Sequence, residues 1–145
     1  ETTGPRGVME TASGSPWPAF HSLPGTVYPV YHILATVGEL RDGDLLPVTT
    51  SDPLRTTALA IRHQGQTRIL LANLLPESQT ITLRTTGDRA TVRLLDETTA
   101  LAALQPPETF RTTPSTSLTI ADNRLVLALL PYAIAQIDIE RRGRE

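Results

Sequence analysis

The stretch LRTTALAIRHQGQTRILLAN, residues 54–73, decides the fold class of this chain. Its two outer parts, 54–63 and 67–73, are of strand length and carry apolar residues with a period close to two. The polar segment QGQ, 64–66, lies between them and is typical of a hairpin turn. The stretch therefore predicts two neighbouring antiparallel strands joined by a tight turn.

A two-residue alternation of apolar and polar side chains continues through most of the chain, as expected of strands that bury one face. The further predicted strands are QTITLRT (79–85), ATVRLLD (90–96), SLTI (117–120), LVLALL (125–130) and PYAIAQIDIE (131–140). Strands of this number and spacing predict a mainly β protein, an antiparallel two-sheet β-sandwich of about seven to eight strands.

The connections give more specific expectations. SLTI and LVLALL are predicted to form a second hairpin, because Asp122 and Asn123 between them tolerate a turn backbone. ILLANLL (69–75) and LVLALL are apolar on both faces, which favours central strands or strands that the helix also covers. TALAAL (99–104) predicts one helical turn, and the prolines after it predict a loop that crosses between the sheets.

The first part of the chain follows a different pattern. Residues 1–24 are rich in Gly, Pro, Ser and Thr without any period, which predicts a long loop. In GTVYPVYHILATVGELRDG (25–43), with Thr26 as N-cap and Gly43 as stop, apolar residues recur at helical spacing. They are Val27, Val30, Tyr31, Leu34 and Val37. We therefore expect a loop and one α-helix in 1–43, and the sandwich in 44–145.

Composition excludes several classes of protein. The 145 residues suffice for one domain with a core. The formal net charge is -2, and the basic residues cluster only in ERRGRE (140–145), which is interpreted as a solvated tail, so nucleic-acid binding is not expected. The chain has no Cys and no apolar run of the roughly 18 residues that a membrane helix needs. A cytoplasmic protein without a membrane partner is expected.

No catalytic motif stands out. The spacing of His21, His32 and His63 matches no zinc pattern, so we expect no metal site. His32 is predicted to be a helix-surface or core residue and His63 a solvated one, which leaves His21, in the loop, as the histidine able to approach a ligand. There is no nucleophile elbow, no phosphate loop and no carboxylate pair with the spacing for acid–base work. The sandwich is expected to hold no catalytic residue and no cofactor.

Three stretches resemble the C-terminal part of the D-apionate lactonase family. They are ETTGPRGVMET (1–11), SLPGTVYPVYHILA (22–35) and LLPYAIAQIDI (129–139). The order of elements also resembles the end of a (β/α)8 barrel followed by an accessory β-domain, as in many glycoside-hydrolase-like proteins. The resemblance implies that the chain begins at the mouth of the eighth barrel strand and that 25–40 is the eighth barrel helix of a larger enzyme.

The resemblance also implies a function. The parent enzyme would hydrolyse the lactone of a branched five-carbon sugar acid, by attack of water on an ester carbonyl. This chain would be its non-catalytic C-terminal sandwich, bracing the upstream catalytic barrel of the same polypeptide, and the main catalytic residues would lie upstream. Active sites of barrels lie at the C-terminal ends of the strands, so the candidates here for approaching substrate are Glu1, Thr2, Arg6 and His21.

Two alternatives remain open. The chain could be the accessory domain of a glycosidase, which only upstream carboxylates would distinguish from a lactonase. It could instead be a carbohydrate-binding module, although the region from Leu54 onward holds only two aromatic residues, Phe110 and Tyr132. A barrel helix should leave apolar surface around Val27, Tyr28, Tyr31 and Leu34 exposed, or covered by a partner, which includes a second copy of the chain.

Overall fold

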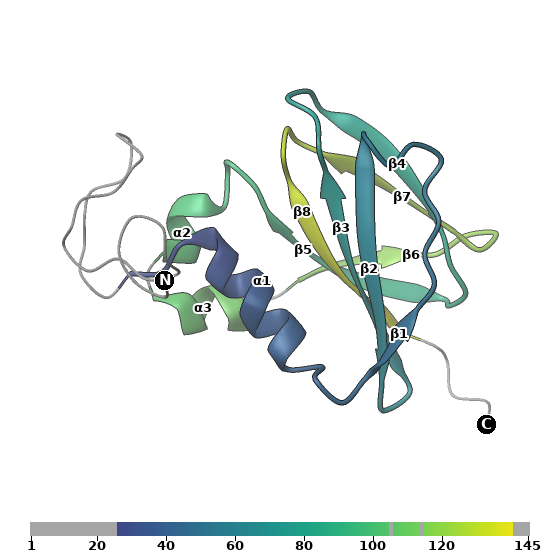
Figure 1. Cartoon of the computed structure of the whole chain (residues 1–145), viewed down its shortest axis with the longest axis horizontal. Helices are drawn as coiled ribbons and strands as arrows, with labels where there is room; N and C mark the ends of the chain where they lie inside the picture. Colours follow the sequence, from purple (N-terminus) through teal and green to yellow (C-terminus); the bar gives the residue numbers. More distant parts are fainter. Residues whose placement is uncertain (1–25, 105, 114, 141–145) are drawn as a thin grey trace. The chain divides into compact units, whose positions relative to one another are not determined.

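The computed structural model of the chain describes residues 26–104, 106–113 and 115–140. These residues form two compact units (Figure 1). The helical unit consists of the described residues up to Arg41 and the described part of Glu97–Pro114. The β unit consists of Asp42–Asp96 and the described part of Ser115–Glu145.

Six strands of the β unit form one antiparallel sheet in the order β1-β2-β3-β8-β5-β6. Their bounds are Asp44–Leu46 for β1, Thr56–His63 for β2, Gln66–Asn73 for β3, Arg89–Leu95 for β5, Thr116–Thr119 for β6 and Ile134–Glu140 for β8. The short β1 was not expected from the sequence, because three residues carry too little periodicity to be recognised.

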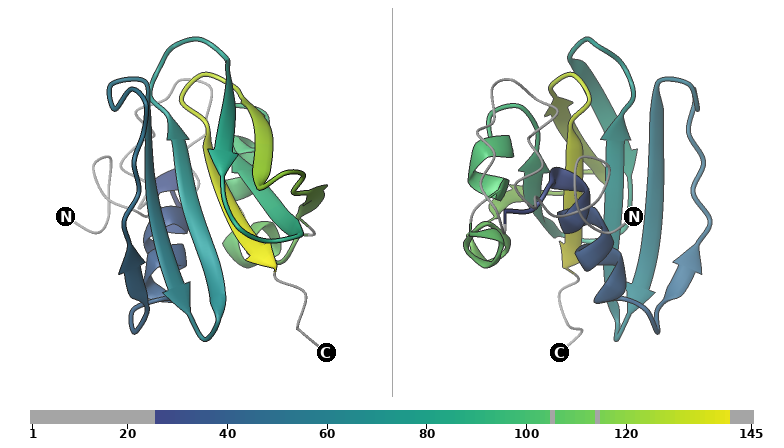
Figure 2. Two further views of the ribbon diagram at one scale, coloured as in Figure 1. Left: turned by 90° about the vertical axis from the view of Figure 1, so that its right-hand side faces the viewer. Right: turned by 60° about the vertical axis from the view of Figure 1, so that its left-hand side comes forward.

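The second sheet contains two antiparallel strands, β4 at Gln79–Arg84 and β7 at Arg124–Leu129. Figure 2 shows the two sheets as the two layers of a sandwich. The expected fold class is thus confirmed: the described chain is mainly β, with eight strands in two antiparallel sheets.

The core lies between the sheets and follows from the two-residue period. In β7, Leu125, Leu127 and Leu129 are buried, and each is separated from the next by an exposed residue. In β8, Ala135, Ile137 and Ile139 alternate with half-buried neighbours in the same way. Full burial of a Leu or Ile side chain contributes about 1.5–3 kcal/mol, so these positions are a main source of stability for the β unit.

The predicted hairpin at QGQ is confirmed. His63 of β2 pairs with Gln66 of β3, and the two residues between them form the turn. Gln64 has a φ of 48° and Gly65 a φ of 82°, the two positive values that a tight type I′ hairpin turn requires.

The second predicted hairpin is wrong. Asp122 and Asn123 do form a tight turn with positive φ, closed by one isolated bridge between Ala121 and Arg124. However, β6 pairs with β5 and β7 pairs with β4, so the strands on the two sides of the turn belong to different sheets. The turn therefore passes the chain from one layer to the other, and packing of the apolar side chains in both layers decides the pairing.

Two further expectations need correction. The strand β3 is central, between β2 and β8, as predicted, but β7 is not, and its Val126 is 58% exposed. The helical turn predicted at 99–104 is confirmed as α2, Ala100–Leu104. The loop predicted after it does not cross between sheets, because β5 and β6 are neighbours in one sheet.

The helical unit contains α1 (Pro29–Gly38), α2 and α3 (Pro107–Thr112). The helix predicted in 25–43 is confirmed, but both predicted ends are wrong. Tyr28, in an extended conformation, is the N-cap instead of Thr26, because the backbone N–H of Val27 donates to the carbonyl of Leu104 at 3.1 Å. Pro29 then suits the first turn, and the helix ends at Gly38, five residues before Gly43.

The buried face of α1 is polar. His32 and Thr36, one turn apart, are buried, whereas Val30 is 46% and Leu34 57% exposed. Of the four residues expected to be exposed, Leu34 is exposed and Tyr31 half-buried. Val27 and Tyr28 are buried, which corrects the expectation for them. The aliphatic side of the helix is thus the side that lacks cover in the described chain.

Candidate functional site

The four residues predicted to approach a substrate, Glu1, Thr2, Arg6 and His21, lie outside the described residues. Their role stays a prediction. Among the described residues, two polar clusters and a pocket bear on what each unit can do.

The first polar cluster surrounds His32 in the helical unit. Its Nε2 lies 2.6 Å from the carbonyl oxygen of Ala103, which can only accept, so this nitrogen carries a proton and donates it. The ring of Phe110 meets the imidazole edge-on at 4.7 Å between centroids, and His32 is 4% exposed. His32 is therefore a core histidine that joins α1 to α2 and α3. Of the two roles predicted for it, helix-surface or core residue, the structure shows the second.

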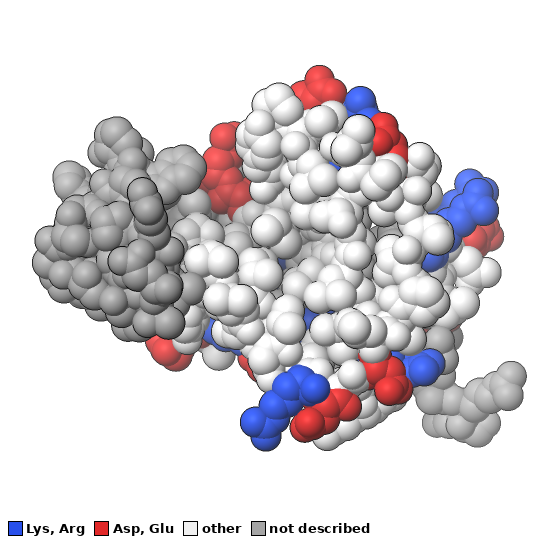
Figure 3. Space-filling view, viewed as in Figure 1, with Lys and Arg blue, Asp and Glu red and all other residues white. Residues whose placement is uncertain are grey.

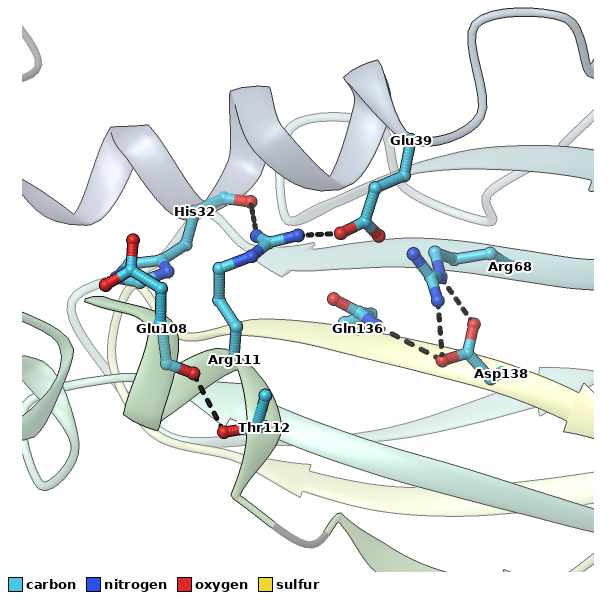
Figure 4. Close-up of polar contacts among 8 residues, drawn as sticks. All are labelled: His32, Glu39, Arg68, Glu108, Arg111, Thr112, Gln136 and Asp138. Carbon is cyan, nitrogen blue, oxygen red and sulfur yellow. Dashed lines mark hydrogen bonds and ion pairs between the residues drawn. The ribbon is translucent and has the colours of Figure 1, made fainter. Parts of the chain in front are cut away.

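Arg111 of α3 extends this cluster along α1 (Figure 4). Its guanidinium donates to the backbone carbonyl of His32 at 3.4 Å and forms an ion pair with Glu39, the C-cap of α1. A cation near the last turn of a helix also interacts favourably with the helix dipole. The contacts of Arg111 are structural, and they fix the orientation of α3 against α1.

The second polar cluster lies on one face of the six-stranded sheet. Arg68 of β3 stands directly opposite Asp138 of β8 and binds it with two nitrogens, at 2.5 Å and 3.2 Å. Gln136 donates to the same carboxylate at 3.1 Å (Figure 4). Because these partners engage both carboxylate oxygens, Asp138 is suited to hold the strands together and poorly suited to act as a base.

The β unit has a pocket of about 300 Å³, which we call the β4 pocket. One wall is the segment 48–52 before β2, the other is β4, and the floor includes Ala58 and Leu71. The remaining lining residues are Arg55 and Thr56. Residues from two distant parts of the sequence thus meet around one hollow of the sandwich.

A hydrogen-bond network makes one end of this pocket rigid. The Nε2 of Gln79, a lining residue, donates to the carbonyl of Arg55 at 3.0 Å and to the Oδ1 of Asn73. Asn73 is 2% exposed, and its Nδ2 donates at 2.8 Å to the carbonyls of both Glu77 and Leu130. A fully satisfied buried amide of this kind holds its surroundings in one arrangement.

The wall at β4 presents the edge of a strand. Five consecutive residues, 79–83, line the pocket, which is possible only if the strand is seen along its edge, since alternate side chains point to opposite faces. The N–H of Thr85 donates to the carbonyl of Asn123, so in this antiparallel ladder the odd-numbered residues bond to β7. Thr80 and Thr82 therefore direct their backbone groups away from β7, and among the described strands β4 has no other neighbour.

The lining of the pocket is rich in hydroxyl groups and balanced in charge. Thr49, Thr50 and Ser51 supply hydroxyls, and Asp52 and Arg55 supply one charge of each sign. In the view of Figure 3, charged side chains lie mainly around the edge of the sandwich, and uncharged residues cover its middle. Such a lining can hydrogen-bond a polar ligand in several directions without a strong preference for either charge.

Two kinds of site are not found among the described residues. No group of three or more His, Cys, Asp or Glu side chains there could hold a metal ion. In the same part of the chain, no helix has the length and apolarity needed to span a membrane.

Sequence reasoning missed the β4 pocket entirely. The one local signal is the run of hydroxyl and acidic residues TTSD, 49–52, which by itself is ordinary loop composition. The pocket depends on the arrangement of two sheets, and no spacing within the sequence encodes that arrangement directly.

The chain was compared with known families, curated proteins and solved structures. A family model described as D-apionate lactonase, C-terminal immunoglobulin-like domain, matches residues 53–137. No curated protein sequence matches. A GH30 endoxylanase from Clostridium papyrosolvens C71 has a similar fold, with a TM-score of 0.59 and 9% identity over 79% of this chain and 28% of that chain. The chain thus spans less than a third of that structure, and at this identity the likeness shows the fold alone.

Proposed function

The chain belongs to the family of D-apionate lactonase C-terminal immunoglobulin-like domains, and from this we propose that it is the non-catalytic accessory domain of a sugar-lactone hydrolase. In that protein it braces an upstream catalytic barrel of the same polypeptide. We further propose that residues 1–43 complete the barrel, that 44–145 form the accessory sandwich, and that the principal catalytic residues lie upstream.

The arrangement of α1 carries the bracing proposal. A helix that covers its own domain normally buries its aliphatic stripe and exposes its polar side. In α1 the buried pair is His32 and Thr36, while Val30 and Leu34 remain about half exposed one turn apart. Apolar side chains that share a helix face in this way favour contact with another body, and the barrel is the occupant we propose.

The proposed contact between α1 and the barrel predicts which variants alter stability. In the full-length protein, Val30→Glu and Leu34→Glu should lower the unfolding temperature of the catalytic domain by several degrees, because they place a charge in an apolar contact. In the isolated chain the same variants should change little, because both side chains are already exposed to water. Leu54→Glu is the matched control, since Leu54 is 82% exposed in the β unit.

Two results would contradict the bracing role. One is an unchanged unfolding temperature of the full-length Leu34→Glu variant. The other is an isolated chain that forms dimers which Leu34→Glu dissociates, because a second copy would then be the occupant of the α1 face.

Catalysis is tested separately, with sugar-acid lactones as substrates. We expect the full-length protein to hydrolyse a lactone of a branched sugar acid and this chain to be inactive. Substitution of Glu1, Arg6 or His21 by Ala in the full-length protein should raise KM if these residues approach substrate, and unchanged kinetics would remove them from the site. Turnover by the chain alone would overturn the non-catalytic assignment.

The accessory domain of a glycoside hydrolase is the second candidate. The fold similarity to a GH30 endoxylanase favours it, because there a domain of this shape forms part of a larger glycoside hydrolase chain. Assays of the full-length protein on glycosides and on lactones, side by side, distinguish the two candidates: cleavage of glycosides without lactone hydrolysis selects this second one.

A further inference from the structure

We propose that the β4 pocket binds a neutral, polyhydroxylated ligand of monosaccharide size. This inference goes beyond the proposed accessory role and does not depend on it, since the pocket lies entirely within the β unit.

The volume of the pocket sets the size of the ligand. At about 300 Å³ it lies at the lower limit of small-molecule sites. A water molecule occupies roughly 30 Å³ of the liquid, so the pocket has the volume of about ten waters. This space suits one five- or six-membered sugar ring with bridging water, and it is too small for a longer chain of sugars to enter as a whole.

The lining determines the polar character of the ligand. The hydroxyls of Thr49, Thr50 and Ser51 each donate and accept, as sugar hydroxyls do. Opposite them, Thr80 and Thr82 direct backbone N–H and C=O groups toward the free edge of β4. Such backbone groups fix the orientation of ligands in many small-molecule sites. A ligand with hydroxyls on both sides can therefore bond to both walls.

The floor and the wall also offer apolar contact. Ala58 and Leu71 form part of the floor, and Ile81 and Leu83 lie along the β4 wall. These apolar side chains can pack against the C–H groups on one face of a sugar ring. None of the lining residues is aromatic, so the ring has no stacking partner and we expect a dissociation constant of roughly millimolar size, the weak end of the affinity scale.

The charges favour a neutral ligand over an anion. Asp52 and Arg55 are both in the lining, and the guanidinium of Arg55 lies 3.4 Å from Glu77. A carboxylate ligand would gain from Arg55 but would meet two acidic side chains nearby, and like charges in a confined site repel. A sugar acid should therefore bind more weakly than the corresponding neutral sugar.

Titration of the 15N-labelled chain with D-xylose, D-ribose and D-glucose, followed by NMR, tests the proposal. We expect saturable shifts of the amide signals of Thr80 and Thr82 with at least one of these sugars. The matched anions D-xylonate, D-ribonate and D-gluconate should bind at least threefold more weakly. The absence of saturable shifts with all three neutral sugars would overturn the proposal, and so would anions that bind equally well.

Two variants and one matched control locate the site. Ala58→Leu fills the floor and should abolish binding, whereas Thr57→Leu, on the opposite face of the same strand, should leave it unchanged. The double variant Thr50→Val and Ser51→Ala removes two hydroxyls from the exposed segment and should weaken binding severalfold, even if Ala58→Leu does not fold. Binding that survives the double variant unchanged would place the sugar elsewhere and refute the proposed site.

Discussion

The side-chain amide of Asn73, at the end of β3, donates to the backbone carbonyl of Leu130 at 2.8 Å, across 57 residues of sequence. The same side chain also bonds to Glu77 and Leu75 and accepts from Gln79. One buried residue thus joins the end of β3 to the turn before β4 and to the segment after β7. This relationship defines the rigid end of the β4 pocket.

Replacement of Asn73 by Ala should lower the free energy of unfolding of the β unit by about 3 kcal/mol, because the hydrogen bonds of one buried amide to four partly buried groups are lost at once. Urea denaturation followed by circular dichroism measures the change. Gln66→Ala, at an exposed position of the same strand, should stay within about 0.5 kcal/mol. Equal effects of the two substitutions would show that the amide network contributes nothing specific.

Two cross-strand ion pairs among the described residues of the β unit should differ in strength. Arg68 and Asp138 have side chains 19% and 31% exposed and are joined by two bonds, so Arg68→Met should cost about 1–2 kcal/mol. Arg62 and Asp44 lie 3.8 Å apart with side chains 52% and 79% exposed, so Arg62→Met should cost less than about 0.5 kcal/mol. Double-mutant cycles on both pairs, repeated in high salt, measure each coupling energy. The prediction is wrong if the exposed pair has the larger coupling energy.

Gly87 should tolerate no side chain. It has a φ of 158°, and a Cβ there would lie 2.6 Å from the Cγ2 of Ile139, inside the core. We expect Gly87→Ala to destabilise the β unit by about 2 kcal/mol, through overpacking and a strained backbone. Gly38→Ala is the matched control, because a Cβ at the end of α1 meets nothing within 4 Å. Thermal denaturation of both variants should show a lower unfolding temperature only for Gly87→Ala.

The bond from His32 to Ala103 should hold the helical unit together. His32→Phe keeps a ring against Phe110 but leaves the carbonyl of Ala103 without this donor, which should cost about 1–2 kcal/mol. Hydrogen exchange of the amides in α1 and α2 should accelerate about tenfold as a result. Leu34→Phe, at an exposed site of the same helix, should leave exchange unchanged. Unaltered exchange in His32→Phe would show that packing alone holds these helices.

The strands were predictable because their signal is local. Each of β2 to β8 lies within or next to a segment whose apolar residues recur with a period near two, and the turn at Gln64 and Gly65 carries its own sequence signal. The partner of each strand was less predictable. The turn at Asp122 and Asn123 has the sequence of a hairpin, yet its flanking strands join different sheets. The local sequence specifies a turn, but the packing of both layers decides which strand pairs with which.

For α1 too, the local sequence predicted the element but not the face that it buries. The spacing of apolar residues in 25–43 predicted α1. The resemblance to a barrel helix led us to expect that Val27 and Tyr28, beside Leu34, would be exposed or covered by a partner, whereas both are buried in the described chain. Which face is buried depends on α2 and α3, whose Ala103 and Phe110 contact His32. Those contacts span more than 70 residues of sequence and leave no periodic signal in it.

The sequence by itself determined the fold class, the strand segments and the family resemblance, because periodicity, turn chemistry and characteristic stretches are properties of contiguous residues. Only the tertiary structure decided the sheet order, the buried polar face of α1 and the β4 pocket. The pocket joins residues 48–56 to 79–83 through the packing of two sheets, and its free strand edge exists because β4 has one neighbour among the described strands. Such features arise from contacts between distant segments, whose free energy depends on the whole packed arrangement.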